Sequence, residues 1–152
     1  MIPIYMKWTI LWTVIISHYA GAQNLDRKII VKGVAREYIL HVPSIIKTPN
    51  KIPLMLVFHG GGGSARNAIS FFGMNSVADT AGFIIAYPNG LDKGWNDGRT
   101  IKNHTHDDVG FVRQLIQQVS KEYPIDRQRI FATGISNGGF FSFMLEIGRA
   151  HV

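Results

Sequence analysis

The sequence of 152 residues contains no cysteine. This absence excludes disulfide bonds, a cysteine nucleophile and a metal site with cysteine ligands. Basic residues are scattered: the net charge is +6, but no four of them follow one another. Scattered cations are typical of a solvated surface and not of a nucleic-acid-binding patch. We expect no nucleic-acid partner, no bound metal and no cofactor.

The N-terminal apolar stretch is short. It covers residues 8–16, which is too few to span a membrane. Lys7 precedes it, and residues 20–22 (Ala-Gly-Ala) offer a small-residue cleavage site. This pattern is typical of a secretory signal peptide over residues 1–22, so we expect a secreted or periplasmic protein with no stable membrane anchor. A buried N-terminal strand or helix is the alternative.

Residues 134–138, with the sequence GISNG, have the form G-x-S-x-G. Residues 129–133 before them are apolar and β-prone, and residues 140–145 after them are apolar and continue a helix. In this context the motif indicates a nucleophile elbow, which exposes a serine hydroxyl at the carboxyl edge of a sheet. We therefore predict Ser136 as the catalytic nucleophile. An ordinary glycine-rich turn is the alternative.

A second glycine-rich segment follows the apolar run 54–58. His59 and four glycines come directly after it, and a loop of this kind places a backbone N–H toward the substrate carbonyl in α/β-type hydrolases. A flexible turn or a phosphate loop is the alternative, but residues 63–65 lack the lysine that a phosphate loop requires. We predict that His59 and Trp95 bind substrate. The predicted oxyanion-hole residues are Gly60, Gly61, Gly62 and Asn137.

The predicted elements alternate after an initial strand pair. Two strands, over 28–32 and 36–42, are expected to be joined by a turn at Lys32 and Gly33. Alternating strands and helices then predict an α/β fold with a mostly parallel sheet and helices on both faces. With the nucleophile elbow, the antiparallel start fits an α/β-hydrolase fold, truncated after the helix of the elbow. The later strands are expected over 52–58, 83–87 and 128–133, and the helices over 67–80 and 107–123. Their predicted buried positions are Ile69, Phe72, Val77, Ala78, Val109, Val112, Leu115, Ile116 and Val119.

Acidic and histidine side chains before the motif have simpler explanations than catalysis. Asp107 and Asp108 are expected as charges at a helix N-terminus, where they favour the helix dipole. Thr105 with Asp108 resembles a capping box. His104 and His106 are expected at the surface or at a helix cap.

A triad base and acid are lacking downstream. In this fold both follow the serine, yet only Glu146 and His151 do so, and neither lies far enough along the chain. We expect residues 23–146 to be the N-terminal part of a catalytic domain that is inactive alone. Residues 147–152 are expected to be a non-native tail.

Five segments in order resemble the secreted polyhydroxybutyrate-depolymerase-like and feruloyl-esterase-like α/β hydrolases. They are residues 56–62, 86–90 with 95–97, 107–111, 125–126 and 129–139. The resemblance implies a serine esterase whose substrate is a carboxylic ester, which is either a feruloyl or acetyl ester of plant polysaccharide or a short polyhydroxyalkanoate. A prolyl-oligopeptidase-type peptidase and a non-catalytic binding module of the same fold remain as alternatives.

Overall fold

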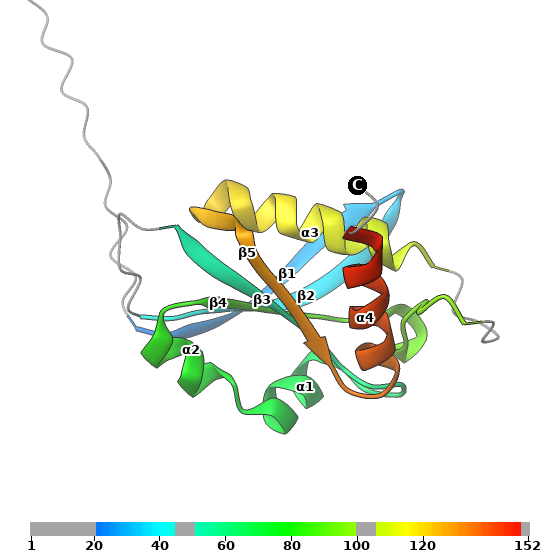
Figure 1. The fold of residues 1–152 in the computed structure, drawn as a ribbon, viewed down its shortest axis with the longest axis horizontal. Helices are drawn as coiled ribbons and strands as arrows, with labels where there is room; N and C mark the ends of the chain where they lie inside the picture. Colours follow the sequence, from blue (N-terminus) through cyan, green and yellow to red (C-terminus); the bar gives the residue numbers. More distant parts are fainter. Residues whose placement is uncertain (1–20, 45–50, 100–105, 150–152) are drawn as a thin grey trace, which may run out of the picture.

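The computed structural model describes residues 21–44, 51–99 and 106–149. The side chains of residues 147–149 are not described. A five-stranded sheet in the order β1-β2-β4-β3-β5 forms its centre (Figure 1). Most of the expected signal peptide, His104, Thr105 and His151 lie outside the described residues. The strands are β1 (Gln23–Val31), β2 (Val34–Val42), β3 (Ile52–Phe58), β4 (Ile84–Pro88) and β5 (Ile125–Gly134).

The described sheet is mixed. β1 pairs antiparallel with β2, and β2 pairs antiparallel with β4. β3 runs parallel to both β4 and β5. Lys32 (φ 49°) and Gly33 (φ 80°) make the turn between β1 and β2, and two left-handed residues are what a tight hairpin turn requires.

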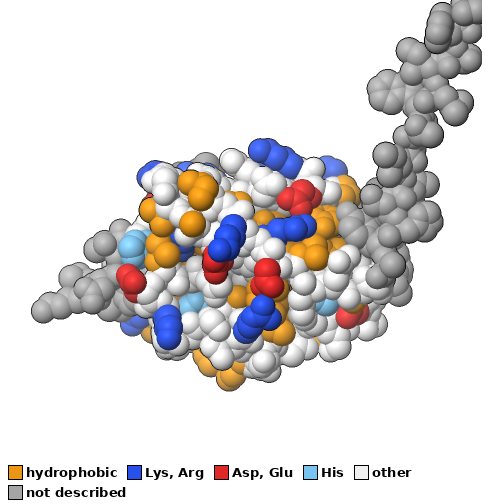
Figure 2. Space-filling view, turned by 180° about the vertical axis from the view of Figure 1, so that it is seen from behind, with side chains coloured by type: hydrophobic (Ala, Val, Ile, Leu, Met, Phe, Trp, Pro, Cys, Tyr) orange, Lys and Arg blue, Asp and Glu red, His pale blue; other side chains and the backbone are white. Residues whose placement is uncertain are grey.

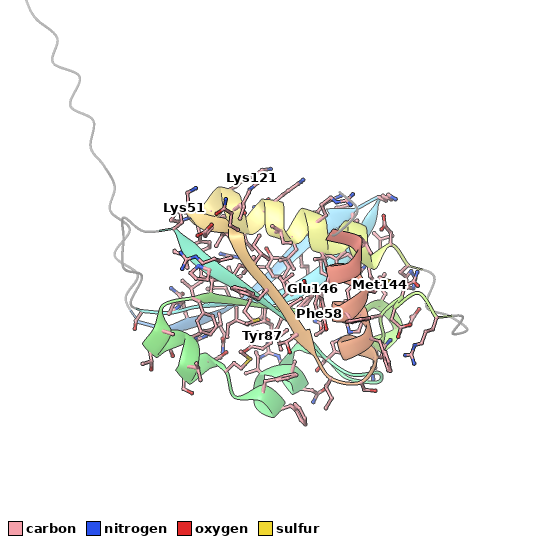
Figure 3. The ribbon with its side chains drawn as sticks, viewed as in Figure 1. Lys51, Phe58, Tyr87, Lys121, Met144 and Glu146 are labelled. Atoms are coloured by element: carbon pink, nitrogen blue, oxygen red, sulfur yellow. The ribbon has the colours of Figure 1, made fainter. Side chains whose placement is uncertain are left out.

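Helices cover both faces of the sheet (Figure 1). One cluster of buried apolar side chains lies between the sheet and α3 and α4, and a second lies between the sheet and α1 and α2. Phe58 belongs to the first cluster and Tyr87 to the second, so neighbouring strands contribute to both (Figure 3). The helices are α1 (Ala65–Phe72), α2 (Asn75–Ala81), α3 (Asp108–Glu122) and α4 (Asn137–Arg149), with a short 3-10 helix at Leu91–Lys93.

The helix predicted over 67–80 is two helices. Gly73 ends α1 in a left-handed conformation (φ 59°), and α2 begins afresh at Asn75. The helical spacing therefore does not carry across the break. Ala78 is fully buried as predicted, whereas Val77 is 55% exposed and does not belong to the core.

The start of α3 differs in one residue from the prediction. Asp107 is the N-cap and accepts a hydrogen bond from the Gly110 N–H at 2.8 Å. Asp108 is the first residue of the helix, and its side chain is buried in an ion pair with Arg36 of β2. Its second oxygen accepts the Asn96 N–H at 2.7 Å. Asp108 lies in the first turn of α3 as predicted, but its burial and its ion pair were not predicted, because its partners lie far from it in the sequence.

Charges of both signs are interspersed over the described surface. On the face in Figure 2, Lys and Arg side chains lie among Asp and Glu. Several form ion pairs, such as Arg66 with Asp26 and Lys28 with Glu37. None of the described helices is both long and apolar enough to cross a membrane.

Candidate active site

Ser136 lies in the turn between β5 and α4. Its φ of 52° is a left-handed conformation that few non-glycine residues adopt. Such a conformation costs on the order of 1–3 kcal/mol and recurs at active sites, although the tight turn at Lys32 adopts it as well. The side chain is exposed, and its hydroxyl makes no hydrogen bond to a described residue. The serine is thus presented at the carboxyl end of a strand, as a nucleophile elbow requires.

Two glycines allow this turn to pack closely. A Cβ on Gly138 would lie 2.3 Å from the His59 carbonyl oxygen and 2.6 Å from that of Phe58. A Cβ on Gly134 would lie 2.5 Å from the carbonyl carbon of Gly138. Side chains at either position would therefore push α4 away from β3 and β5.

The glycine loop after β3 lies beside the elbow. A Cβ on Gly60 would be 3.6 Å from the Cβ of Ser136, and one on Gly61 would be 3.9 Å from the Cβ of Asn137. The N–H groups of Gly60 and Gly61 make no hydrogen bond to a described residue. Gly62 differs, because its N–H donates to the Lys93 carbonyl at 2.7 Å. That bond occupies the donor, so Gly62 does not fit its predicted place in the oxyanion hole.

Asn137 presents its backbone outward and its side chain inward. It is the first residue of α4, and its N–H makes no bond to a described residue, as expected for the first turn of a helix. Its buried amide oxygen accepts the Trp95 N–H at 2.8 Å. The amide nitrogen donates to the Trp95 carbonyl at 3.0 Å and to Asp97 Oδ2 at 2.7 Å. The side chain is therefore fixed by three bonds.

His59 and Trp95 lie behind the loop and not on its surface. His59 Nδ1 donates to the Gly60 carbonyl at 2.8 Å, and Nε2 accepts the Gly90 N–H at 3.0 Å. Burial lowers the pKa of His59, which agrees with this neutral form. Trp95 is 0% exposed, and its ring stacks on Phe141. Neither ring is accessible to a substrate in this structure, so the predicted substrate contacts do not fit it.

An ion pair that sequence reasoning missed lies next to the elbow. Arg99 binds Asp97 through Nε and Nη2, and its guanidinium lies 3.9 Å from the ring centre of Phe140. Hydrogen bonding by Arg99 lowers the pKa of Asp97, with Asn137 adding to the effect. Asp97 is thus held ionised beneath the turn that carries Ser136.

The histidines among the described residues are engaged away from Ser136. His41 contacts Asn24 and Asp79, and His106 contacts Asp92. His59 is buried as described above. Within the described part of the chain, no histidine or carboxylate is hydrogen-bonded to the serine hydroxyl.

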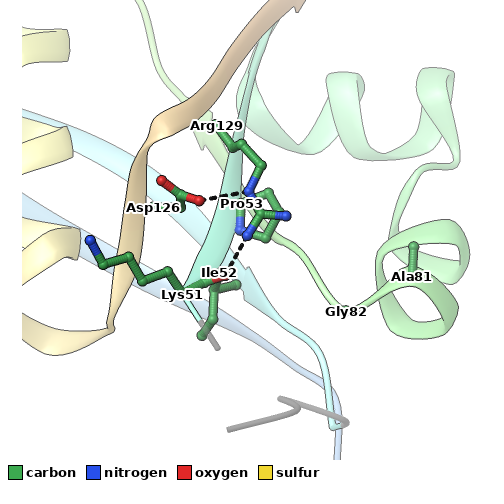
Figure 4. A pocket seen from close by; sticks show the side chains of 7 residues that line it. All are labelled: Lys51, Ile52, Pro53, Ala81, Gly82, Asp126 and Arg129. Atoms are coloured by element: carbon green, nitrogen blue, oxygen red, sulfur yellow. Dashed lines mark hydrogen bonds and ion pairs between the residues drawn. The ribbon is translucent and has the colours of Figure 1, made fainter. Parts of the chain in front are cut away.

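Two hollows in the described surface lie away from Ser136. One of about 380 Å³ lies at the amino ends of β3 and β5, where Arg129 binds Asp126 and the Lys51 carbonyl (Figure 4). The other, of about 580 Å³, is an apolar groove beside β5 between α3 and α4. In parallel sheets ligands bind at the carboxyl ends of the strands, so the first hollow lies at the opposite edge from the expected site.

Comparison with known proteins gives relatives with esterase names. The chain is 33% identical over 130 residues to "Putative esterase NocK" of Nocardia uniformis subsp. tsuyamanensis, covering 83% of this chain and 38% of that one. It is 31% identical over 121 residues to Feruloyl esterase C of Emericella nidulans, covering 76% of this chain and 42% of that one. Among solved structures, it resembles a thermostable esterase with a TM-score of 0.63 and 23% identity, over 80% of this chain and 36% of that chain. The fold is that of the α/β hydrolases. No protein-family model matches the chain.

The sequence reveals those site residues that lie close together in the chain. Ser136 and the glycines form contiguous motifs. The side-chain bonds of Asn137 to Trp95 and Asp97 join residues some 40 positions apart, with separations of 42 and 40. No local pattern encodes such a pair.

The chain spans only 38% and 42% of the two curated relatives, so the activity of a whole protein is a matter for proposal.

Proposed function

We propose that the chain belongs to a secreted serine esterase in which Ser136 is the nucleophile. The observation that carries this proposal is the exposed serine in a left-handed turn, packed against a glycine loop. The esterase names of the relatives support the reaction class. The signal-like pattern of residues 1–22 supports export.

The mechanism follows from the groups around the serine. The Ser136 hydroxyl attacks the ester carbonyl, and a negative oxygen develops as the carbonyl becomes tetrahedral. The N–H groups of Asn137 and of Gly60 or Gly61 are the donors for that oxygen, because they are unpaired among the described residues. Fixed donors of this kind need no reorganisation during the reaction, which is why they lower its barrier.

A base and an acid complete the proposal. A serine hydroxyl is a weak nucleophile until a base takes its proton, and no described residue is placed to do so. We propose that residues 23–146 are the N-terminal part of the catalytic domain and that both groups come from a longer protein. Residues 147–152 are proposed as a non-native tail. The chain as given is then expected to hydrolyse esters poorly.

The proposed substrates are esters of a carboxylic acid on a larger molecule. The relative named feruloyl esterase C supports feruloyl esters, and an esterase/xylanase from Neocallimastix patriciarum, 32% identical over 112 residues, supports acetyl esters of xylan. Short polyhydroxyalkanoates are the second class. Phe140, one helical turn after the serine, is 53% exposed although the Arg99 guanidinium lies over its ring, and the exposed part of this side chain is the proposed contact for an aromatic acyl group.

Kinetics of the Ser136→Ala variant test the proposal. In the protein translated from the complete gene, the change should lower kcat on methyl ferulate by on the order of 10³-fold or more, because the nucleophile is lost. A short 3-hydroxybutyrate oligomer provides the alternative substrate. Tyr87→Phe is the control, since it removes a hydrogen bond to Asn75 away from the site, and the melting temperature of each variant checks its folding. Near-normal kcat in Ser136→Ala would refute the assignment of Ser136 as the nucleophile. High esterase activity of the 152-residue chain would refute the proposal that the base comes from a longer protein.

A further inference from the structure

The segment of residues 90–97 holds the glycine loop at three points. Gly90 donates its N–H to His59 Nε2 at 3.0 Å. The Lys93 carbonyl accepts the Gly62 N–H at 2.7 Å. The Trp95 indole N–H donates to the His59 carbonyl at 2.9 Å. These bonds fix the loop on both sides of Gly60 and Gly61.

The same segment also holds the elbow. The Asn137 amide pairs with both backbone groups of Trp95, as one strand residue would pair with another. Asp97 accepts the remaining amide hydrogen at 2.7 Å. Among the described residues, Trp95 alone is hydrogen-bonded both to the glycine loop and to the residue after the nucleophile.

We propose that Trp95 is a positioning residue that sets the distance between the two oxyanion donors. The inference rests on the proposed function, because it needs the N–H groups of Asn137 and the glycine loop to bind the same oxygen. The Trp95 backbone binds the side chain of Asn137, whose backbone N–H is one donor. The Trp95 indole binds the His59 carbonyl, which belongs to the same peptide group as the N–H of Gly60, the other donor. The rigid Trp95 side chain therefore connects the two halves of the oxyanion hole.

The surroundings of Trp95 leave it little freedom. Its ring lies 5.1 Å from that of Phe58, 4.9 Å from that of His59 and 5.3 Å from that of Phe141, between ring centres. Next to it, the Asn96 N–H is held by Asp108, which is paired with Arg36. The segment is thus anchored to β2, β3, α3 and α4 at once.

A positioning role has a kinetic signature that a purely structural role lacks. Oxyanion donors bind the transition state more strongly than the substrate, so a change in their spacing lowers kcat and leaves KM largely unchanged. A misplacement of about 1 Å can cost about 10²-fold in rate. General loss of structure would instead lower the fraction of active enzyme and the melting temperature.

The test is Trp95→Phe in the protein translated from the complete gene. Phenylalanine keeps an aromatic ring in the cluster but removes the indole N–H, so the His59 carbonyl loses its partner. We expect kcat on methyl ferulate to fall about 10-fold or more with KM within about 2-fold, because the oxyanion donors are displaced and not removed, and removal of one donor costs about 10²–10³. Tyr87→Phe is the matched control: it removes the 2.7 Å hydrogen bond from the Tyr87 hydroxyl to Asn75 on the other face of the sheet.

A second readout is the affinity for an inhibitor that mimics the transition state. The serine oxygen adds to the carbonyl of a trifluoromethyl ketone, its proton passes to the base of the complete enzyme, and a hemiketal oxyanion remains. The inhibition constant of this ketone should therefore rise in Trp95→Phe in step with the fall in kcat. Inhibition by coniferyl alcohol, which carries the same aromatic ring but no carbonyl or carboxylate oxygen, should stay unchanged. Unchanged kcat and ketone affinity in Trp95→Phe would overturn the proposal, as would equal losses in Tyr87→Phe.

Ser136→Ala separates this proposal from the proposed function. If Ser136→Ala is inactive and Trp95→Phe is normal, the esterase assignment stands and the positioning role falls. If Ser136→Ala is active, the proposed function fails first.

Asn137→Asp, which loses both amide donor bonds but keeps its N–H, should show the same kcat-selective loss. Failure of both variants to fold while Tyr87→Phe folds would overturn the proposal in favour of a structural role.

Discussion

At the scale of single residues, Gly138 determines how closely α4 approaches β3. A methyl group there would overlap two carbonyl oxygens of β3 and its loop. Gly138→Ala should therefore lower the free energy of unfolding by about 1–3 kcal/mol or more, the usual cost of overpacking. Gly61→Ala, at an exposed position with free space, should stay within about 0.5 kcal/mol of the unchanged chain. Urea denaturation measures both, and equal stabilities would contradict the packing argument.

Single residues also mark the limit of reading the sequence. Ser136 could be predicted because its glycines lie beside it in the chain. The burial of Asp108 could not, since Arg36 is 72 residues away. For the same reason Trp95 looked like a substrate contact, whereas the packed rings around it come from β3 and α4. Long-range pairs of this kind have no local pattern that reveals them.

At the scale of elements, segment 90–97 should give the fold a measurable dependence on acid. The pKa of Asp97 is lowered in the folded state, mainly by Arg99, so the ionised form stabilises the fold at neutral pH. That contribution is lost as the pH falls through the lowered pKa, below about 4. Asp97→Asn should therefore be clearly less stable than the unchanged chain at pH 7, and the difference should shrink by about pH 2.

Thermal unfolding at several pH values checks this prediction. Asp107 and Asp126 also have lowered pKa values, caused chiefly by Lys32 and Arg129, so the unchanged chain and the variant share that background. Asp126→Asn is the control. Its ion pair is more exposed, so the change at pH 7 should be smaller. A stability difference for Asp97→Asn that is independent of pH would count against an ionised Asp97.

The boundaries of helices and strands could be predicted where glycine or proline marks them. The turn at Lys32 and Gly33, and the helix ended by Pro124, follow from residues with restricted or unusual backbones. The break at Gly73 was missed because an isolated glycine does not always end a helix, and the apolar spacing on its two sides looked continuous. The parallel pairing of β3 with β4 and β5 followed from the alternation of strands and helices.

At the scale of the whole molecule, β5 is one edge of the described sheet. Edge strands carry unpaired N–H and C=O groups that favour association, and Phe131 of β5 is 48% exposed. The 152-residue chain should therefore self-associate as its concentration rises, and Phe131→Lys should weaken this. Val34→Lys, at a 45% exposed residue of the interior strand β2, is the control. Sedimentation velocity measures the association state at each concentration. A chain that is monomeric at every concentration would contradict the predicted self-association.

The order in which the site is synthesised follows from the contacts of Asn137. Its side-chain partners, Trp95 and Asp97, both precede it in the chain, as does the glycine loop. A ribosome therefore makes the loop first, then the segment that holds it, and last the elbow that the segment fixes. When α4 emerges, the nascent chain already contains every described residue that sets the oxyanion donors. This half of the site is therefore fully synthesised before any segment that follows α4.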